Sequence, residues 1–298
     1  MRHKQLTFYH LFTLALIQGI TEFLPVSSSG HLILLPRLTN FSDQGLLIDV
    51  SVHIGTLTAV IVYFWKDSLS LLKGFYDLTL GDRTSKSAKL VKFLTVATIP
   101  VIILGLIFKL TDFIEVIRNI KVIGYTMIIF GVILYLADRL NSNTRTEPNN
   151  YPKDAIVLGL WQSIALIPGT SRSGVTITAA RILGYERKNA ARIAMLMSIP
   201  TILASGTVEI ADIWYQANLA HLSDAVVVSL LSFIFAFFAL AVMMKLLKSI
   251  NFTPYVIYRV ALGLSLIHIS EPTRPERIAF SVLCLKKKRG GGGGGGGG

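Results

Sequence analysis

Long uncharged, apolar runs alternate along the chain with short polar and charged segments. Seven runs can be delimited, with Asp49 as the one charge among them, at 5–21, 46–65, 93–108, 122–137, 155–171, 193–208 and 225–244. A helix needs about 20 apolar residues to cross a bilayer core of about 30 Å, or slightly fewer where flanking side chains snorkel. Five of these runs, all except the first and the fifth, are therefore predicted to span a membrane.

The other two runs, 5–21 and 155–171, lead directly into clusters of small polar residues. The first continues into VSSSGH and the second into GTSRSG. Irregular polar backbone is tolerated at membrane depth only where it is buried in protein or lines a cavity. These two segments are predicted to be re-entrant hairpins, which enter the membrane and turn back.

The distribution of Lys and Arg supports this arrangement, because cytoplasmic loops carry an excess of both. Fifteen fall in one set of loops, at 66–92, 138–154, 181–192 and 245–254. Only four fall in the other set, at 37–45, 109–121 and 209–224. The first set is predicted to be cytoplasmic. Since two of its loops flank the second hairpin, that hairpin enters and leaves on the inner side, and the first hairpin enters from outside.

An internal repeat relates the two polar clusters. A shift of 144 residues aligns QGITEFLPVSSSGHLI (18–33) with QSIALIPGTSRSGVTI (162–177). Each half then contains one hairpin and three spans, and an odd number of crossings inverts the second half. The predicted fold is an all-α integral membrane protein with an inverted-topology repeat. It forms a single domain over 1–264, with halves at about 5–137 and 153–264.

Composition agrees with this prediction. Of 298 residues, 52% are hydrophobic and 15% are charged, which is too little charge to cover a water-soluble domain of this size. The net charge of +12 lies in short clusters between apolar runs, so no nucleic-acid partner is expected. The single Cys284 excludes a disulfide framework.

The C-terminal segment 265–298 differs in sequence character from the rest of the chain. It begins with SLIHISEPTRPERIAF, which resembles a translated sequencing adapter, and it ends in nine glycines. We expect this segment to be a non-native tail. The alternative is a genuine flexible, basic tail.

Three ionisable residues, Glu22, His31 and Arg172, lie inside otherwise apolar segments. Such a group costs about 2.5–3.5 kcal/mol at membrane depth and needs a partner or a polar cavity. Their places on the two hairpins predict that they meet. Arg172 suits the bidentate binding of phosphate oxygens. Around them lie candidate donors for a large anion, namely Ser27, Ser28, Ser29, Gly30, Gly169, Thr170, Ser171, Ser173, Gly174 and Thr176.

The same segments offer metal-binding and proton-transfer groups. Glu22 can ligate a divalent cation, and Gln18, one turn earlier on the same helix face, can add a neutral ligand. His31 can act as general acid or base, or as a nucleophile at phosphorus. His53 is predicted to be a buried histidine bonded by a neighbour, with a place in the cavity as the alternative. These residues fit both an intramembrane enzyme and a transporter or flippase for a lipid-linked or small anionic solute.

The stretches QGITEFLPVSSSGH and PGTSRSGVT resemble the two signature motifs of the bacterial undecaprenyl pyrophosphate phosphatase family of the bacitracin-resistance type. The resemblance covers residues 6–264. It implies hydrolysis of undecaprenyl pyrophosphate, dependent on Mg2+ or Ca2+, to undecaprenyl phosphate and inorganic phosphate. This reaction recycles the lipid carrier for peptidoglycan synthesis and gives bacitracin resistance. The resemblance further implies a multi-pass protein of the bacterial cytoplasmic (inner) membrane with a polyprenyl pyrophosphate lipid as partner, and it leaves a homodimer open.

The family's residue roles carry over by position. They assign metal binding to Gln18 and Glu22. They assign catalysis to Ser27, Ser28 and His31 together with Glu22 and Arg172. They assign pyrophosphate binding to Ser171, Arg172 and Ser173. Many members have Glu at the position of Gln18, so one ligand charge is missing here. Either Ser27 or His31 can attack phosphorus. We expect His31 to be the acid or base, with Ser27 as nucleophile or phosphate ligand.

Overall fold

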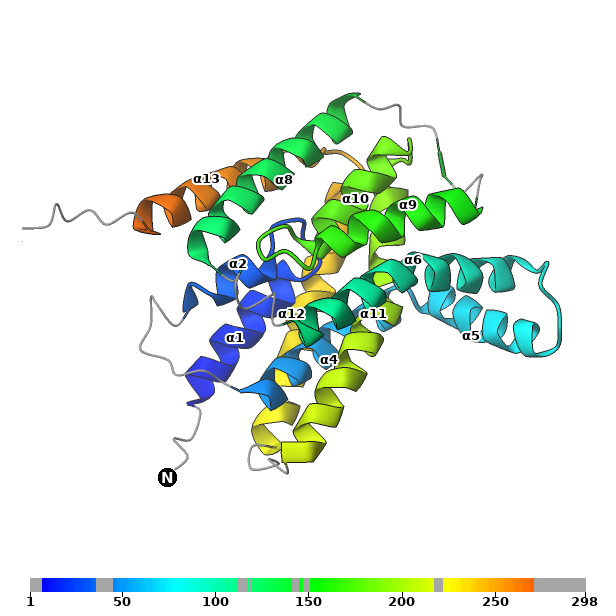
Figure 1. The fold of residues 1–298 in the computed structure, drawn as a ribbon, viewed down its shortest axis with the longest axis horizontal. Coiled ribbons are helices and arrows are strands. Elements are labelled where there is room, and N and C mark those ends of the chain that lie inside the picture. Colours follow the sequence, from blue (N-terminus) through cyan, green and yellow to red (C-terminus); the bar gives the residue numbers. More distant parts are fainter. Residues whose placement is uncertain are drawn as a thin grey trace, which may run out of the picture.

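The computed structural model describes residues 7–35, 45–111, 117, 119–140, 145–146, 151–216 and 222–270, and within them the chain is helical (Figure 1). The helices are α1 (Phe8–Thr21), α2 (Ser28–Leu32), α4 (Leu46–Tyr63), α5 (Trp65–Thr79), α6 (Lys86–Leu110), α8 (Ile120–Leu140), α9 (Tyr151–Ile164), α10 (Arg172–Ile182), α11 (Arg187–Gln216), α12 (Leu222–Leu246) and α13 (Thr253–Ser270). One isolated bridge pairs Arg145 with Tyr185. The predicted all-α class is confirmed.

Five helices of the described part are long and apolar enough to cross a membrane, namely α4, α6, α8, α11 and α12. They coincide with the five runs that the hydropathy pattern predicts to span. On α12, large apolar side chains such as Leu230 and Phe238 remain 59% and 64% exposed. Apolar faces of this extent suit contact with lipid. The chain is therefore a membrane protein.

The charge-rich segment 66–92 is largely helical rather than a loop, which corrects the expectation from its charges. Helix α5 packs one face, with Leu71 and Gly74 buried, against α6. A Cβ atom on Gly74 would lie 2.3 Å from the carbonyl oxygen of Ser87, so the two helices approach closely at this glycine. In Figure 1, α5 and the beginning of α6 form a hairpin that projects at the right of the molecule.

Helices α1 and α9 are too short to cross a bilayer. Each has 14 residues, which corresponds to about 21 Å at 1.5 Å per residue. Residues 22–27, the first loop, connect α1 to α2. Residues 165–171, the second loop, connect α9 to α10. Figure 1 shows the two loops at the centre of the molecule, between α1, α9 and α10.

The longer helices surround these loops. Helix α4 packs against both α12 and α11, α1 packs on α12, and α9 packs on α6. Helices α8 and α13 run side by side at the top of Figure 1. Where α4 meets α12, a Cβ atom on Gly55 would lie 2.1 Å from the carbonyl oxygen of Ser229. Close backbone approach at this glycine sets the distance between the two helices.

Helix α13 continues through Ser270, past the boundary at 264 expected for the native domain. Its Leu266 is fully buried and packs with Ile123 and Met127 of α8. Residues 271–298 lie outside the described residues, so the non-native tail remains a prediction.

Candidate active site

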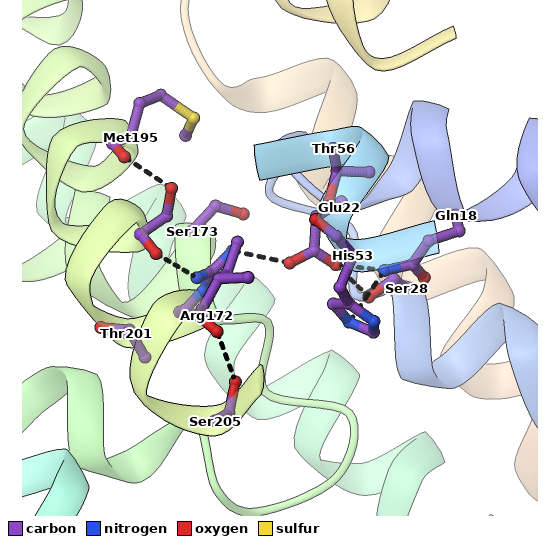
Figure 2. Close-up of polar contacts among 12 residues, drawn as sticks. Gln18, Glu22, Ser28, His53, Thr56, Arg172, Ser173, Met195, Thr201 and Ser205 are labelled. Atoms are coloured by element: carbon purple, nitrogen blue, oxygen red, sulfur yellow. Dashed lines mark hydrogen bonds and ion pairs between the residues drawn. The ribbon is translucent and has the colours of Figure 1, made fainter. Parts of the chain in front are cut away.

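An ion pair joins the end of α1 to the start of α10 (Figure 2). Glu22 follows the last residue of α1, and Arg172 is the first residue of α10. Arg172 Nη2 donates to Glu22 Oε1 at 2.6 Å, and the side chains are 16% and 9% exposed. Removing one partner of such a buried pair would leave the other charge buried without a counterion, which destabilises the fold. The prediction that these two residues meet is confirmed.

The second carboxylate oxygen of Glu22 accepts two further hydrogen bonds. Gln18 Nε2 donates at 2.8 Å, and the hydroxyl of Ser28, the first residue of α2, donates at 3.0 Å. The four-residue spacing on α1 places Gln18 and Glu22 on one face, as predicted. This carboxylate therefore ties together α1, α2 and α10.

His53 of α4 completes this cluster. Its Nδ1 lies 2.7 Å from the carbonyl oxygen of Asp49, which only accepts, so Nδ1 carries the proton. Its Nε2 therefore accepts from Gln18 Nε2, at 3.1 Å. His53 is bonded by neighbours, as predicted, and it also lies in the cluster, which was the alternative (Figure 2).

His31 lies on α2, three residues after Ser28 and hence on the same face of the helix. Its Nδ1 is 2.7 Å from the carbonyl oxygen of Ser27, so this nitrogen also carries a proton. Its Nε2 is 2.6 Å from the hydroxyl of Tyr258 on α13. Sequence analysis did not find Tyr258, because the two residues are 227 positions apart.

Two predicted serines, Ser29 and Ser173, bond the first loop and α2 to the second loop and α10. The hydroxyls of Ser27 and Ser29 are 3.1 Å apart, and Ser29 accepts from the backbone N–H of Gly169 at 3.3 Å. Ser173 donates to the carbonyl oxygen of Leu24 at 3.0 Å. These contacts fix the first loop and α2 against the second loop and α10.

Other predicted substrate-binding groups form hydrogen bonds within the second loop and α10. Thr170 and Thr176 are fully buried and donate to backbone carbonyl oxygens at 2.8 and 2.9 Å. The hydroxyl of Ser171 accepts from the N–H of Gly174 at 3.2 Å and so caps α10. These hydroxyl contacts determine the shape of the backbone around Arg172.

Arg259 of α13 is a further residue that sequence analysis missed. It is fully buried and donates to carbonyl oxygens of both loops and of α8, namely Thr170 at 2.8 Å, Met127 at 3.1 Å, Gly169 at 3.2 Å and Pro25 at 3.4 Å. The signal was present, because Arg259 is the one charge in an apolar run.

Of the three predicted glycines, Gly169 has a Cβ position only 2.2 Å from Thr126 Oγ1. The other two also lie where there is no room for a side chain. A Cβ atom on Gly174 would lie 2.7 Å from Arg259 Nη1, and one on Gly30 would lie 2.9 Å from Met127 Sδ. Both glycines therefore permit the close packing of α2 and α10 against α8 and α13.

The cluster has a donor set that suits a cation bound together with phosphate. Among the described residues, no group of three or more His, Cys, Asp or Glu side chains could hold a metal ion. The cluster does contain the Glu22 carboxylate and the Oε1 atom of Gln18, which is buried and has no hydrogen-bond partner in the described part of the chain. Mg2+ is often bound by one or two carboxylates plus substrate phosphates. These residues fit that mode of binding.

The fold and the site define a class of protein, a helical membrane protein in which two loops form a buried polar site. Sequence comparisons identify the family. The family described as bacitracin resistance protein BacA matches residues 11–265. The undecaprenyl-diphosphatase of Roseobacter denitrificans is 56% identical over 262 residues, which are 88% of this chain and 98% of that protein.

Two further relatives carry the same name. The undecaprenyl-diphosphatase of Jannaschia sp. is 53% identical over 265 residues, 89% of this chain and 99% of the relative. That of Aliivibrio salmonicida is 43% identical over 270 residues, 88% of this chain and 98% of the relative. The chain belongs to the BacA family.

Proposed function

We propose that this protein hydrolyses undecaprenyl pyrophosphate to undecaprenyl phosphate and inorganic phosphate in the bacterial inner membrane. Relatives named undecaprenyl-diphosphatase match nearly their whole length to this chain, which supports this reaction. The observation that carries the proposal is the buried pair of Glu22 and Arg172 where the two hairpins meet. The reaction would return the lipid carrier to peptidoglycan synthesis and so give resistance to bacitracin.

An inverted repeat of two re-entrant hairpins, each followed by three spans, would place this site near the middle of the membrane. In such a repeat, α9 corresponds to α1, α10 to α2, α11 to α4, α12 to α6 and α13 to α8. The contact of α1 with α12 then has its counterpart in the contact of α9 with α6. The contacts of α4 with α11 and of α8 with α13 are each their own counterparts. This packing supports the repeat, and the short α1 and α9 support the hairpins.

Arg172 is the group best suited to hold the pyrophosphate. A guanidinium has five N–H donors. In Arg172, Nη2 donates to Glu22 at 2.6 Å and Nη1 makes a long contact of 3.4 Å with the carbonyl oxygen of Ser198. Donors therefore remain for phosphate oxygens, while Glu22 fixes the orientation of the planar group.

His31 is the group best suited to move the proton. Because Nδ1 donates to the backbone, Nε2 has the lone pair that can take up the proton released by the attacking water. The water oxygen attacks the terminal phosphorus, and the bond from that phosphorus to the bridging oxygen breaks. Undecaprenyl phosphate leaves with the electron pair. Ser27 is 2% exposed and its hydroxyl contacts Ser29, which argues against a role as nucleophile.

A divalent cation, Mg2+ or Ca2+, would be held by Glu22 and the Oε1 atom of Gln18 together with oxygens of the pyrophosphate. When bound, such a cation neutralises charge on the phosphates and on the leaving group. Glu22 would then orient Arg172 as well as ligate the cation.

The test is phosphate release by the purified protein from undecaprenyl pyrophosphate or a C15 pyrophosphate, with and without Mg2+. We expect His31→Ala to lower kcat about 10²–10⁴-fold, the usual contribution of a positioned proton-transfer group. Glu22→Gln and Arg172→Ala should abolish turnover. Arg83→Ala, at an exposed position between α5 and α6, is the matched control and should behave as wild type. Binding of the lipid without phosphate release, as by a transporter or flippase, would refute the proposal.

A further inference from the structure

Tyr258 contacts the reactive nitrogen of His31, and the roles proposed above do not include it. Its hydroxyl lies 2.6 Å from His31 Nε2. The two rings are nearly parallel, with 2° between their planes and 5.6 Å between their centres. Tyr258 is 46% exposed, so the protein does not enclose its side chain.

The direction of this hydrogen bond follows from the other side of the imidazole ring. His31 Nδ1 donates to the carbonyl oxygen of Ser27, so the lone pair of the neutral ring lies on Nε2. The Tyr258 hydroxyl must therefore donate to Nε2. A base that is oriented by one group and bonded to a hydroxyl by its other nitrogen is a recurring catalytic arrangement.

Water cannot bond to Nε2 while this contact lasts, because Nε2 has a single lone pair. The tyrosine oxygen can still accept a hydrogen bond from water. The adjacent residue holds the tyrosine in place, since Arg259 is buried and donates to carbonyl oxygens of both loops. A proton path through Tyr258 therefore needs no movement of its side chain, whereas direct access of water to Nε2 requires the Tyr258 hydroxyl to move away.

We propose that Tyr258 is a further catalytic residue, which relays the proton of the attacking water to His31. This inference rests on the proposed hydrolysis. As the water oxygen bonds to the terminal phosphorus, its proton moves to the tyrosine oxygen, and the tyrosine proton moves to Nε2. The bond to the bridging oxygen breaks, and that oxygen leaves with the electron pair. The imidazolium then returns its proton through Tyr258 to the product phosphate, which restores both side chains.

Tyr258→Phe tests the relay, because it keeps the ring and removes only the hydroxyl. Phosphate release from a C15 pyrophosphate by the purified full chain gives kcat and KM. We expect kcat to fall about 10²-fold, as for loss of a proton-transfer group, with KM unchanged within about twofold. Tyr255→Phe is the matched control, because Tyr255 lies one turn earlier on α13 and packs against Phe252. It should show wild-type kcat.

A double variant separates a relay from a structural role. If Tyr258 and His31 act as one unit, Tyr258→Phe should cost nothing further in a His31→Ala background. Additive losses in the double variant, wild-type kcat in Tyr258→Phe, or a change in KM alone would each overturn the relay. Failure of the wild type to release phosphate would instead refute the proposed hydrolysis, so the two failures are distinguishable.

Discussion

Replacing Arg259 with methionine should disable the site by releasing both loops from their common donor. Carbonyl oxygens of Pro25, Gly169 and Thr170 would lose a buried partner. At about 1 kcal/mol for each orphaned acceptor, the low end of the usual range, the assembled loops lose about 3 kcal/mol. This corresponds to an equilibrium constant for loop assembly about 10²-fold smaller. We therefore expect kcat/KM for phosphate release to fall about 10²-fold in Arg259→Met.

Arg181 provides the matched control, because it is equally buried but serves another part of the fold. Its Nε donates to Asp138 Oδ1 at 2.9 Å, and Asp138 also accepts from Arg187 at 2.8 Å. Arg181→Met should lower the Tm in detergent by breaking this buried network, yet leave kcat/KM of the folded protein near wild type. Equal loss of activity in the two variants, or full activity in Arg259→Met, would refute the reasoning.

Two other perturbations have defined outcomes. Gly55→Ala should lower the Tm, since its Cβ atom would lie 2.1 Å from the carbonyl oxygen of Ser229. Pushing α4 away from α12 should cost about 1–3 kcal/mol. Gly206→Ala is the control and should leave the Tm unchanged, because no atom lies within 4 Å of the added Cβ atom. Chelation of divalent cations should abolish phosphate release. Gln18→Glu should lower the Mg2+ concentration needed for half-maximal rate, because it adds a ligand charge. Undiminished turnover in excess chelator would contradict the proposed metal.

Hydropathy was sufficient to predict the five spanning helices, because the bilayer sets their length whatever they pack against. It failed for 66–92, where six Lys and Arg suggested a loop. Helix α5 occupies Trp65–Thr79 and buries only Leu71 and Gly74. The charges of Lys66, Asp67, Lys73 and Asp77 obscured a short helix that packs against α6.

The central pair was predictable for a similar reason, since a charge at membrane depth needs a partner. Glu22 and Arg172 were the opposite charges on the two hairpins. The same rule applies to Arg259. However, Arg259 donates to backbone carbonyl oxygens, which every residue has, so its partners cannot be predicted from the sequence. The contact of Tyr258 with His31 was equally hidden, because α13 is brought to α2 by its packing on α8.

The backbone of the two loops is strained at equivalent positions. Ser27 and Ser171 have φ of 75° and 69°, and they are the non-glycine residues of the described part with positive φ. Holding an L-residue in such a sparsely populated conformation costs about 1–3 kcal/mol. Each serine hydroxyl instead contacts the serine two residues later, at 3.1 Å in both loops. Strain of this kind persists where the surrounding structure requires it, most often at functional sites.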